Sequence, residues 1–370
     1  METSEVTTAN IIPSKPRFDY GIGPFIGCDP EIFLEAEDGH IVGSERVIPE
    51  KGVIAPGAYH VTRSQLIQDG VQVELNPSAQ TCRANVANEI AIIFRHLRKM
   101  LAGQKLKVSF RSVVEVDRKE LDSLSEKSRT LGCAPSLNIY DSKATISVPK
   151  DFAGRSAGGH IHLGLDKSSL EPAGRLVQLL DLGLGNTFVL LERDPLVTER
   201  RKVYGRAGEH RLPKHGLEYR VLSNFWLRSY PLTSLAWGLA RQIVALHLMK
   251  KGEYAKELLK QTDPAAVMKA INENDLGLAW KNFEVFAAFM EKFNFGSGSG
   301  YLSLPSSRMP AFRHFARMIQ EKGIEYWFPK DPMTYWCDEY TEGHDKGWEW
   351  YCDTTVTPDL RKWQLDQVKE

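Results

Sequence analysis

The sequence predicts a mixed α+β fold built around an antiparallel sheet. Short β-like runs alternate with helical patterns along the chain, and five of them are residues 25–36, 71–76, 107–116, 160–165 and 217–223. These runs lie too far apart to be joined by single crossover helices, and the helical patterns gather in the second half of the chain. Both observations favour an antiparallel sheet over a doubly wound parallel one.

The first segments can be assigned in chain order. Residues 1–20 are polar and carry two prolines, so we expect a flexible N-terminal arm before the first strand at Phe25. After the first two β-like runs, apolar side chains recur at a helical period from Val86 to Leu101. A helix over residues 86–101 should therefore lay one face on a core.

Capping signals place the later helices. Ser229 precedes Pro231, a residue tolerated in the first helical turn, and the apolar run that follows stops at Gly252. Asp263 followed by Pro264 repeats this start signal. The predicted helices after the first are thus 172–192, 229–252, one beginning at 263, 276–293 and 308–322.

We divide the chain into the arm 1–20, a main domain 21–330 and a C-terminal segment 331–370. In the C-terminal segment, tryptophan and tyrosine are mixed with acidic residues. The apolar area of these rings favours a segment that packs on the domain surface, and the alternative is a cover over a site.

Composition restricts the functional class. The chain has 370 residues, of which 42% are hydrophobic and 25% charged, as in ordinary soluble globular proteins. Its 47 basic residues balance 47 acidic ones, which argues against a dedicated binder of nucleic acid or membrane surfaces. No apolar run is long enough to span a bilayer and no signal-peptide pattern is present, so we expect a cytoplasmic protein. The five scattered cysteines are expected to be free thiols.

The strongest local signal is the sequence RSAGGHIHLG over residues 155–164. On a strand, His160 and His162 would point to one face while Ile161 and Leu163 face the core. Two imidazoles on one face suit a metal or phosphate site, and the alternative is a hydrogen-bonded structural pair.

Carboxylates occupy the polar faces of three further strands. Alternation puts Glu218 and Arg220 on one face, Glu74 with its neighbour Asn76 on another, and Glu31 opposite the apolar side chains of its own strand. Taken singly, each could be a surface group. Together with the imidazoles they could converge as ligands for Mg²⁺ or Mn²⁺.

Positive charge for a phosphate would come from residues 193–220, because neither a P-loop nor a dinucleotide-binding glycine motif is present. Eight basic residues stand in this segment against four acidic ones. The basic residues are Arg193, Arg200, Arg201, Lys202, Arg206, Arg211, Lys214 and Arg220. Guanidinium groups match phosphate oxygens, so a triphosphate site is one interpretation and a solvated basic loop is the other.

The order of four motifs resembles a known family. GCDPEIFL, DGVQVELNPSA, GGHIHLGL and GLEYRVLSNFW, followed by a helix that starts YPLTSLAWGLA, are similar to the carboxylate-amine ligases (amidoligases) of tailed phages. These are distant members of the glutamine synthetase and γ-glutamylcysteine ligase superfamily. The resemblance covers roughly residues 21–250. Glutamine synthetase has an acidic pair in its first metal strand, whereas Gln72 stands at the paired position here, so the number of metal ions stays open.

The resemblance implies a fold and a set of roles. The main domain would be a glutamine-synthetase-like antiparallel sheet with helices on its outer face and the active site on its open concave face. The implied metal ligands are Glu31, Glu74, His160 and Glu218. The implied nucleotide-binding residues are Arg206, Arg211, Arg220, His162, Gly158 and Gly159, and Arg155 and Asn76 would bind substrate. Glu74, Arg211 and Arg220 form the implied catalytic set.

The implied reaction is ATP-dependent amide formation through an acyl phosphate, with Mg²⁺ or Mn²⁺ as cofactor. The substrates would be a carboxylate and an amine on small molecules, peptides or proteins, and the resemblance does not name them. The alternatives are a metal-dependent hydrolase, a guanidino-type kinase, or a virion or scaffold protein that keeps the fold without catalysis.

Overall fold

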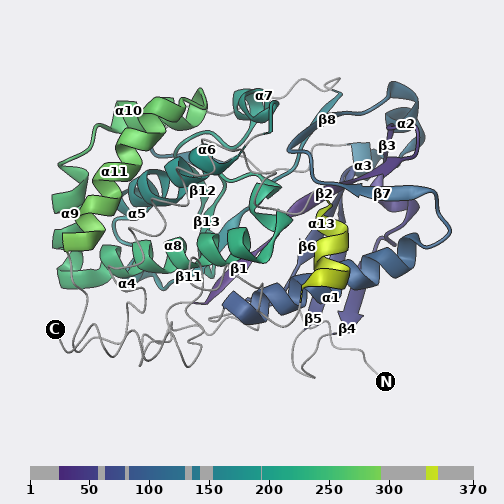
Figure 1. Cartoon of the computed structure of the whole chain (residues 1–370), viewed down its shortest axis with the longest axis horizontal. Helices are drawn as coiled ribbons and strands as arrows, with labels where there is room; N and C mark the ends of the chain where they lie inside the picture. The colour runs from purple at the N-terminus through teal and green to yellow at the C-terminus, as the bar shows by residue number, and fades with distance from the viewer. Residues whose placement is uncertain are drawn as a thin grey trace.

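The computed structural model describes residues 25–56, 63–79, 83–129, 136–141, 153–192, 194–292 and 331–340. Strands and helices are mixed, and every strand pairing in these ranges is antiparallel, as the sequence predicts. Figure 1 shows helices α5 and α9 to α11 gathered at one end of the molecule and strands β2 to β8 at the other. The predicted arm 1–20 and the predicted helix 308–322 lie outside the described residues.

The first sheet has five strands in the order β1-β11-β13-β12-β9. These are β1 (Ile26–Cys28), β11 (Ile161–Gly164), β13 (Gly216–Tyr219), β12 (Glu209–Arg211) and β9 (Leu137–Asn138). Their register aligns Gly27, His162, Glu218 and Arg211 in one row across four neighbouring strands. Two predicted motifs, the histidine pair and the Glu-Tyr-Arg run, are thereby placed side by side.

The second sheet has six strands and carries the remaining acidic motifs. It runs β3-β2-β6-β5-β4, with β7 also paired to β2. The strands are β2 (Glu31–Ala36), β3 (Ile41–Val42), β4 (Val53–Pro56), β5 (Arg63–Asp69), β6 (Gln72–Asn76) and β7 (Leu106–Ser109). A separate pair joins β8 (Val113–Glu115) to β10 (Gly154–Ser156).

Two predicted strands are divided in the structure. The run 25–36 becomes β1 and β2, which belong to different sheets, and the interruption falls at Asp29 and Pro30. Proline has no N–H for a ladder bond, so a break at this point is favoured. The run 107–116 becomes β7 and β8, which also pair with different partners. Alternation within each run could not reveal these changes of sheet.

Helices cover the apolar face of the five-stranded sheet. They are α4 (Lys167–Leu170), α5 (Ala173–Leu180), a π-helical stretch (Asp181–Gly185) and α6 (Asn186–Leu191). The predicted helix 172–192 is therefore confirmed, with a π-helical stretch at its centre. A side chain at Gly185 would collide with Tyr219 of β13 and Ile271, so this glycine allows the helix to pack closely on the sheet. The next helix, α7 (Val197–Val203), contacts β8.

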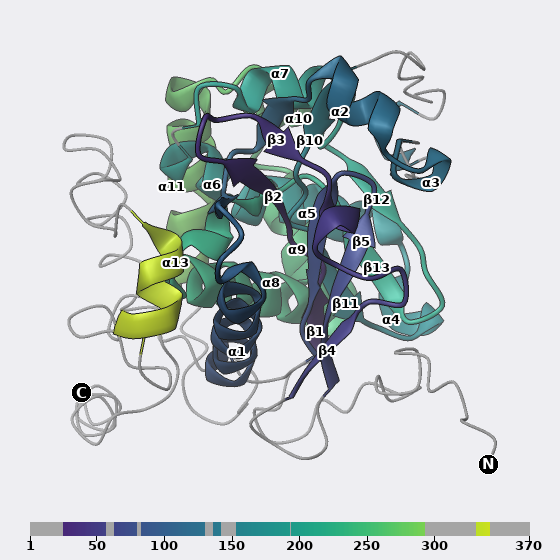
Figure 2. The same ribbon diagram turned by 90° about the vertical axis from the view of Figure 1, so that its right-hand side faces the viewer.

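The remaining helices include the predicted ones near 86–101, from 229, from 263 and from 276, together with α2, α3 and α9, which the sequence did not predict. They are α1 (Arg83–Leu101), α2 (Arg118–Ser123), α3 (Glu126–Arg129), α8 (Tyr230–Leu248), α9 (Glu253–Leu259), α10 (Pro264–Asn272) and α11 (Leu276–Lys292), with 3₁₀ turns at Ser44–Arg46, Asn224–Arg228 and Met249–Gly252. Gly252 has a φ of 83°, a left-handed conformation that favours glycine, and the Asp263 side chain accepts a hydrogen bond from the amide of Ala265 at 2.9 Å. Figure 2 shows α1 beside α8, and the two are in contact.

The stretch 331–340 packs on this core through its aromatic side chains. It forms α13 (Pro332–Thr334) and a π-helical turn (Tyr335–Glu339) next to α1. Trp336 is fully buried, stacks on Phe94 and donates its indole N–H to the carbonyl of Leu227 at 2.6 Å. Among the described residues, no helix is both long and apolar enough to cross a membrane.

Candidate functional site

The five-stranded sheet presents a row of polar side chains on the face opposite its helices. His162 of β11 lies directly across from Glu218 of β13, and Glu218 lies across from Arg211 of β12. The alternate residues, among them Leu217 and Tyr219, are fully buried in the apolar core. The predicted alternation is therefore confirmed for β11 and β13, because apolar side chains fix one face and the polar ones must take the other.

Asp29 joins the two histidines, and sequence reasoning did not single it out. One of its oxygens lies 3.0 Å from His160 Nδ1 and the other lies 3.1 Å from His162 Nε2. Burial alone would raise the pKa of Asp29, but the neighbouring His162 and His160 hold it well below its usual range. Asp29 lies between β1 and β2, where strand alternation makes no prediction.

The two imidazoles differ in their electrostatic setting. Burial lowers the pKa of His160 to about 4, so its ring is neutral near pH 7. Burial also opposes charge on His162, but Asp29 and Glu218 raise its pKa above the ordinary value. Its other ring nitrogen lies 3.0 Å from Nε2 of His215.

Glu218 and two arginines form the next contacts in the row. Its Oε1 lies 3.5 Å from Nε of Arg220, 3.6 Å from a terminal nitrogen of Arg211 and 3.6 Å from His160 Nδ1. Burial nevertheless raises the pKa of Glu218 to about 7. Tyr204 connects the group, because its hydroxyl is hydrogen-bonded to both His160 Nε2 and the Arg220 guanidinium.

Three carboxylates form a second group at the neighbouring sheet. Glu31 of β2 lies directly across from Glu74 of β6, and Asp69 of β5 completes the set. Each offers an oxygen within 4.8 Å of the others. Burial, followed by the charge of Asp69, raises the pKa of Glu31 to about 8, and burial with the surrounding carboxylates raises that of Glu74 well above its usual value. Such crowding of like charges is relieved by a bound cation.

The group of His160 and Glu218 and the acidic group of Glu31, Asp69 and Glu74 are connected by hydrogen bonds of the Gly158 backbone. The amide of Gly158 donates to a carboxylate oxygen of Glu31 at 2.7 Å, and its carbonyl accepts from the amide of Glu31 at 2.9 Å. The charge of Glu218 also contributes to the raised pKa of Glu74. The implied ligands thus fall into two neighbouring sets, with Glu31 and Glu74 in one and His160 and Glu218 in the other.

Gly158 and Gly159 are surrounded by the protein's own atoms. A side chain at Gly158 would meet the His160 ring, and one at Gly159 would collide with the carbonyl oxygen of Ser223 and the indole nitrogen of Trp226. The structure therefore requires glycine here for close packing within the chain. Their predicted role next to a nucleotide stays a prediction.

Gly159→Ala is expected to destabilise the protein by about 1–3 kcal/mol, because the added methyl group must displace backbone atoms of a packed core. Gly277→Ala is the matched control, since the new methyl group would make only an ordinary contact near Asp275. Urea unfolding of both variants measures the effect. A Gly159→Ala midpoint equal to that of the parent would contradict the packing described here.

The basic residues of segment 193–220 have different surroundings, since some bind backbone carbonyls in the core and others lie at the polar row. Arg200 is fully buried and donates to the carbonyls of Val221 and Leu222 at 2.9 and 2.8 Å. Arg201 is also buried and donates to the carbonyl of Ile271. These two arginines hold backbone carbonyls, which corrects the interpretation of the segment as one phosphate-binding cluster.

The other predicted substrate and nucleotide residues take separate positions. Arg206 is exposed in the loop before β12. Asn76 lies beside Glu74, with its amide nitrogen 3.4 Å from a carboxylate oxygen. Arg155 is buried on β10 and donates to the carbonyls of Gly154 and Arg129, both at 3.0 Å. Binding of a substrate by Arg155 and Asn76 stays a prediction.

Comparison with known sequence families identifies the segment that carries the histidine and Glu-Tyr-Arg motifs. Residues 128–273 match the family described as Phage phiEco32-like COOH.NH2 ligase-type 2. The predicted family resemblance is confirmed over this region. The matched carboxylate-amine ligase region contains β11, β12 and β13 and hence the polar row, while Asp29, Glu31, Asp69 and Glu74 precede it in the chain. No curated protein matches the chain.

Proposed function

We propose that this protein is an ATP-dependent carboxylate-amine ligase that forms an amide through an acyl phosphate. One observation carries the proposal, namely the acidic group of Glu31, Asp69 and Glu74 next to the His160 and Glu218 group. The second group lies within the region that matches the ligase family. Hard carboxylate ligands beside guanidinium groups suit the handling of a metal-bound triphosphate.

The residues present fit a divalent cation. Glu31, Asp69 and Glu74 supply oxygens only, which are the ligands that Mg²⁺ prefers. His160 and Glu218 add an imidazole nitrogen and a further carboxylate, a donor set that also suits Mn²⁺. When bound, these ions would neutralise phosphate charge and orient the triphosphate. The glutamine-synthetase-like arrangement of the sheet and the placement of the site on its open face belong to the same proposal.

The arginines would hold the phosphates. Arg220 is positioned by Tyr204 and Glu218, so its fork is oriented before a ligand arrives. The side chain of Arg211 is 30% exposed, so it can reach a ligand on the polar face of the sheet. Arg206 would contact the nucleotide from the adjacent loop, and His162 would contact nucleotide or substrate.

The proposed reaction has two steps. An oxygen of the substrate carboxylate attacks the γ-phosphorus of ATP, the bond to the β,γ-bridging oxygen breaks, and ADP leaves. The amine then attacks the acyl carbon, phosphate departs and the amine nitrogen loses a proton as the amide forms. Arg211 and Arg220 would stabilise the charge on the transferring phosphoryl group, because such transfer depends mainly on positioning and charge neutralisation.

The experiment incubates the protein with ATP, Mg²⁺ and pools of amino acids, peptides and cell-wall fragments. ADP release should require a carboxylate, and hydroxylamine should trap the intermediate as a hydroxamate. Turnover of ATP with no carboxylate requirement and a phosphorylated guanidine product would favour the kinase. Cleavage of a substrate without ATP would favour the hydrolase, and an absence of nucleotide affinity would favour a scaffold role.

Arg211→Gln is expected to weaken ATP binding about 10- to 150-fold, which corresponds to the loss of one charge-assisted contact worth about 1.5–3 kcal/mol. Lys214→Gln is the control, because Lys214 is an exposed residue of the same basic segment and lies outside the row. Calorimetric titration with a non-hydrolysable ATP analogue measures both. Equal affinities in the two variants would place the phosphates elsewhere.

A further inference from the structure

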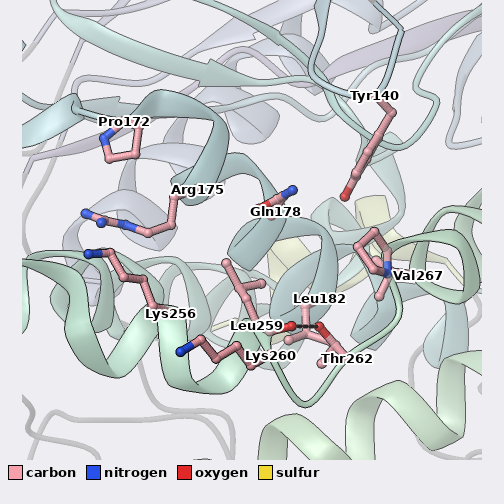
Figure 3. Close-up of a pocket in the computed structure, with 11 residues that line it drawn as sticks. Tyr140, Pro172, Arg175, Gln178, Leu182, Lys256, Leu259, Lys260, Thr262 and Val267 are labelled. Carbon is pink, nitrogen blue, oxygen red and sulfur yellow. Dashed lines mark hydrogen bonds between the residues drawn. The ribbon is translucent and has the colours of Figure 1, made fainter.

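A cavity lies on the helical side of the five-stranded sheet, opposite the polar row. It has a volume of about 450 Å³ and is bordered by α5, α9 and α10 together with Tyr140. Figure 3 shows the side chains that line it. A volume of this size is typical of small-molecule sites.

Among the described residues, the charged side chains that line the cavity are all basic. They are Arg175 of α5, Lys256 of α9 and Lys260, which directly follows α9, and the first two lie close together in Figure 3. Glu253, which is not a lining residue, pairs with Lys256 at 2.8 Å and neutralises part of this charge. Arg175, Lys256 and Lys260 together with Glu253 therefore carry a net charge of two positive units.

Arg175 is held in place by its own contacts. Its Nε lies 3.2 Å from His247 Nδ1, and a terminal nitrogen donates to the His247 carbonyl at 3.2 Å. A side chain at Gly252 would collide with this guanidinium, so the glycine allows the arginine to lie flat against the start of α9. The loss of conformational entropy on binding an anion is therefore partly avoided.

The rest of the cavity wall is apolar with a polar rim. Leu259 and Val267 form part of the wall, and the polar side chains of Tyr140 and Gln178 also line the cavity (Figure 3). The Tyr140 hydroxyl is hydrogen-bonded to Asp181, whose carboxyl also accepts a hydrogen bond from Tyr219 at 2.7 Å. An apolar surface beside fixed cations complements a molecule with an apolar body and one anionic group.

We propose that this cavity binds a small organic anion, a carboxylate or sulfonate carried on an apolar ring or chain. The site is separate from the polar row, because Tyr219 points to the helical face of β13 while Glu218 and Arg220 point to the other. The proposal does not depend on the proposed ligase function.

The test uses the full chain and anilinonaphthalene sulfonate, an anion on an apolar ring system, with neutral phenylnaphthylamine as the uncharged comparison. Fluorescence titration should give one site that binds the sulfonate at least tenfold more tightly than the neutral analogue. The double variant Lys256→Gln/Lys260→Gln should weaken the sulfonate at least tenfold and leave the neutral analogue unchanged. Both lysines are exposed, so the fold should survive.

Lys281→Gln, an exposed position on α11 outside the cavity, is the matched control and should bind like the parent. Thr262→Trp should weaken both probes, because it fills the cavity without altering its charge. Equal affinity for the charged and neutral probes, or parental affinity in the double lysine variant, would overturn the proposal.

Discussion

Replacing Glu31 with glutamine is expected to abolish the stabilisation that Mn²⁺ or Mg²⁺ gives to the parent protein. A cation bound only by the folded state stabilises it by about 2.7 kcal/mol when its concentration is 100 times the dissociation constant. Glu31 lies across from Glu74 and beside Asp69, so its loss removes one of three converging carboxylates. Thermal unfolding with and without metal measures the difference, and turnover in the proposed ligase reaction should fall by about 10²–10³-fold.

Glu35→Gln is the matched control for this experiment. Glu35 lies on the same strand as Glu31, but its carboxylate contacts Lys107 at 2.8 Å and Arg111 at 2.9 Å and lies outside the acidic group. The Glu35→Gln variant should therefore be stabilised by Mn²⁺ or Mg²⁺ as much as the parent protein. A full metal response in both Glu31→Gln and Glu74→Gln would show that the cation binds elsewhere.

The polar row was predictable because it depends on alternation alone. Ile161 and Leu163 must be buried, so His160 and His162 face the other way, and the same reasoning applies to Glu218 and its strand. The family resemblance then brought the separate strands together in one expected site. These inferences need only local pattern and a known order of motifs.

Asp69 and Asp29 could not be selected in the same way. Asp69 is the last residue of β5, whose first residues show no clear alternation of apolar and polar side chains. Its position is fixed by a tight turn, in which Gly70 has a φ of 60° and Asp69 pairs with Gln72. The Asp-Gly pair was a usable turn signal. Asp29 occupies the crossing between two sheets, and only the tertiary arrangement brings it to the histidines.

The basic segment shows a different limit of sequence reasoning. Arg200 and Arg211 are chemically identical in the sequence, yet one is buried against the carbonyls of Val221 and Leu222 and the other lies in the polar row. Charge counts cannot separate these cases. The distinction depends on the position of α7, which places Arg200 against the segment that follows β13.

In the absence of divalent ions, the free energy of unfolding is expected to fall as the pH rises from about 6.5 to about 8. Burial and the neighbouring Asp69 raise the folded-state pKa of Glu31 to about 8, far above its ordinary value of about 4.3. A carboxyl whose pKa is raised on folding contributes its full stabilisation at pH values below its pKa in the unfolded state. This stabilisation is lost as the pH rises through its pKa in the folded state. Glu218 and Asp181, with pKa values raised to about 7, act in the same direction. The lowered pKa of His160 acts oppositely, but only below the ordinary histidine value of about 6.5.

For Glu31 alone the loss amounts to about 2 kcal/mol over 1.5 pH units, because one bound proton changes the unfolding free energy by about 1.36 kcal/mol per unit. Urea unfolding of the chelator-treated protein across this range measures the slope. Glu31→Gln should make the slope shallower, with the remainder due to groups such as Glu218 and Asp181, and Glu35→Gln should leave it unchanged, since only the former removes a carboxyl that is protonated in the fold. Saturating Mg²⁺ should reverse the trend, because metal binding requires deprotonated carboxylates. A Glu31→Gln profile as steep as that of the parent would mean that another group takes up the proton, and the acidic group would then lose its electrostatic basis as a cation site.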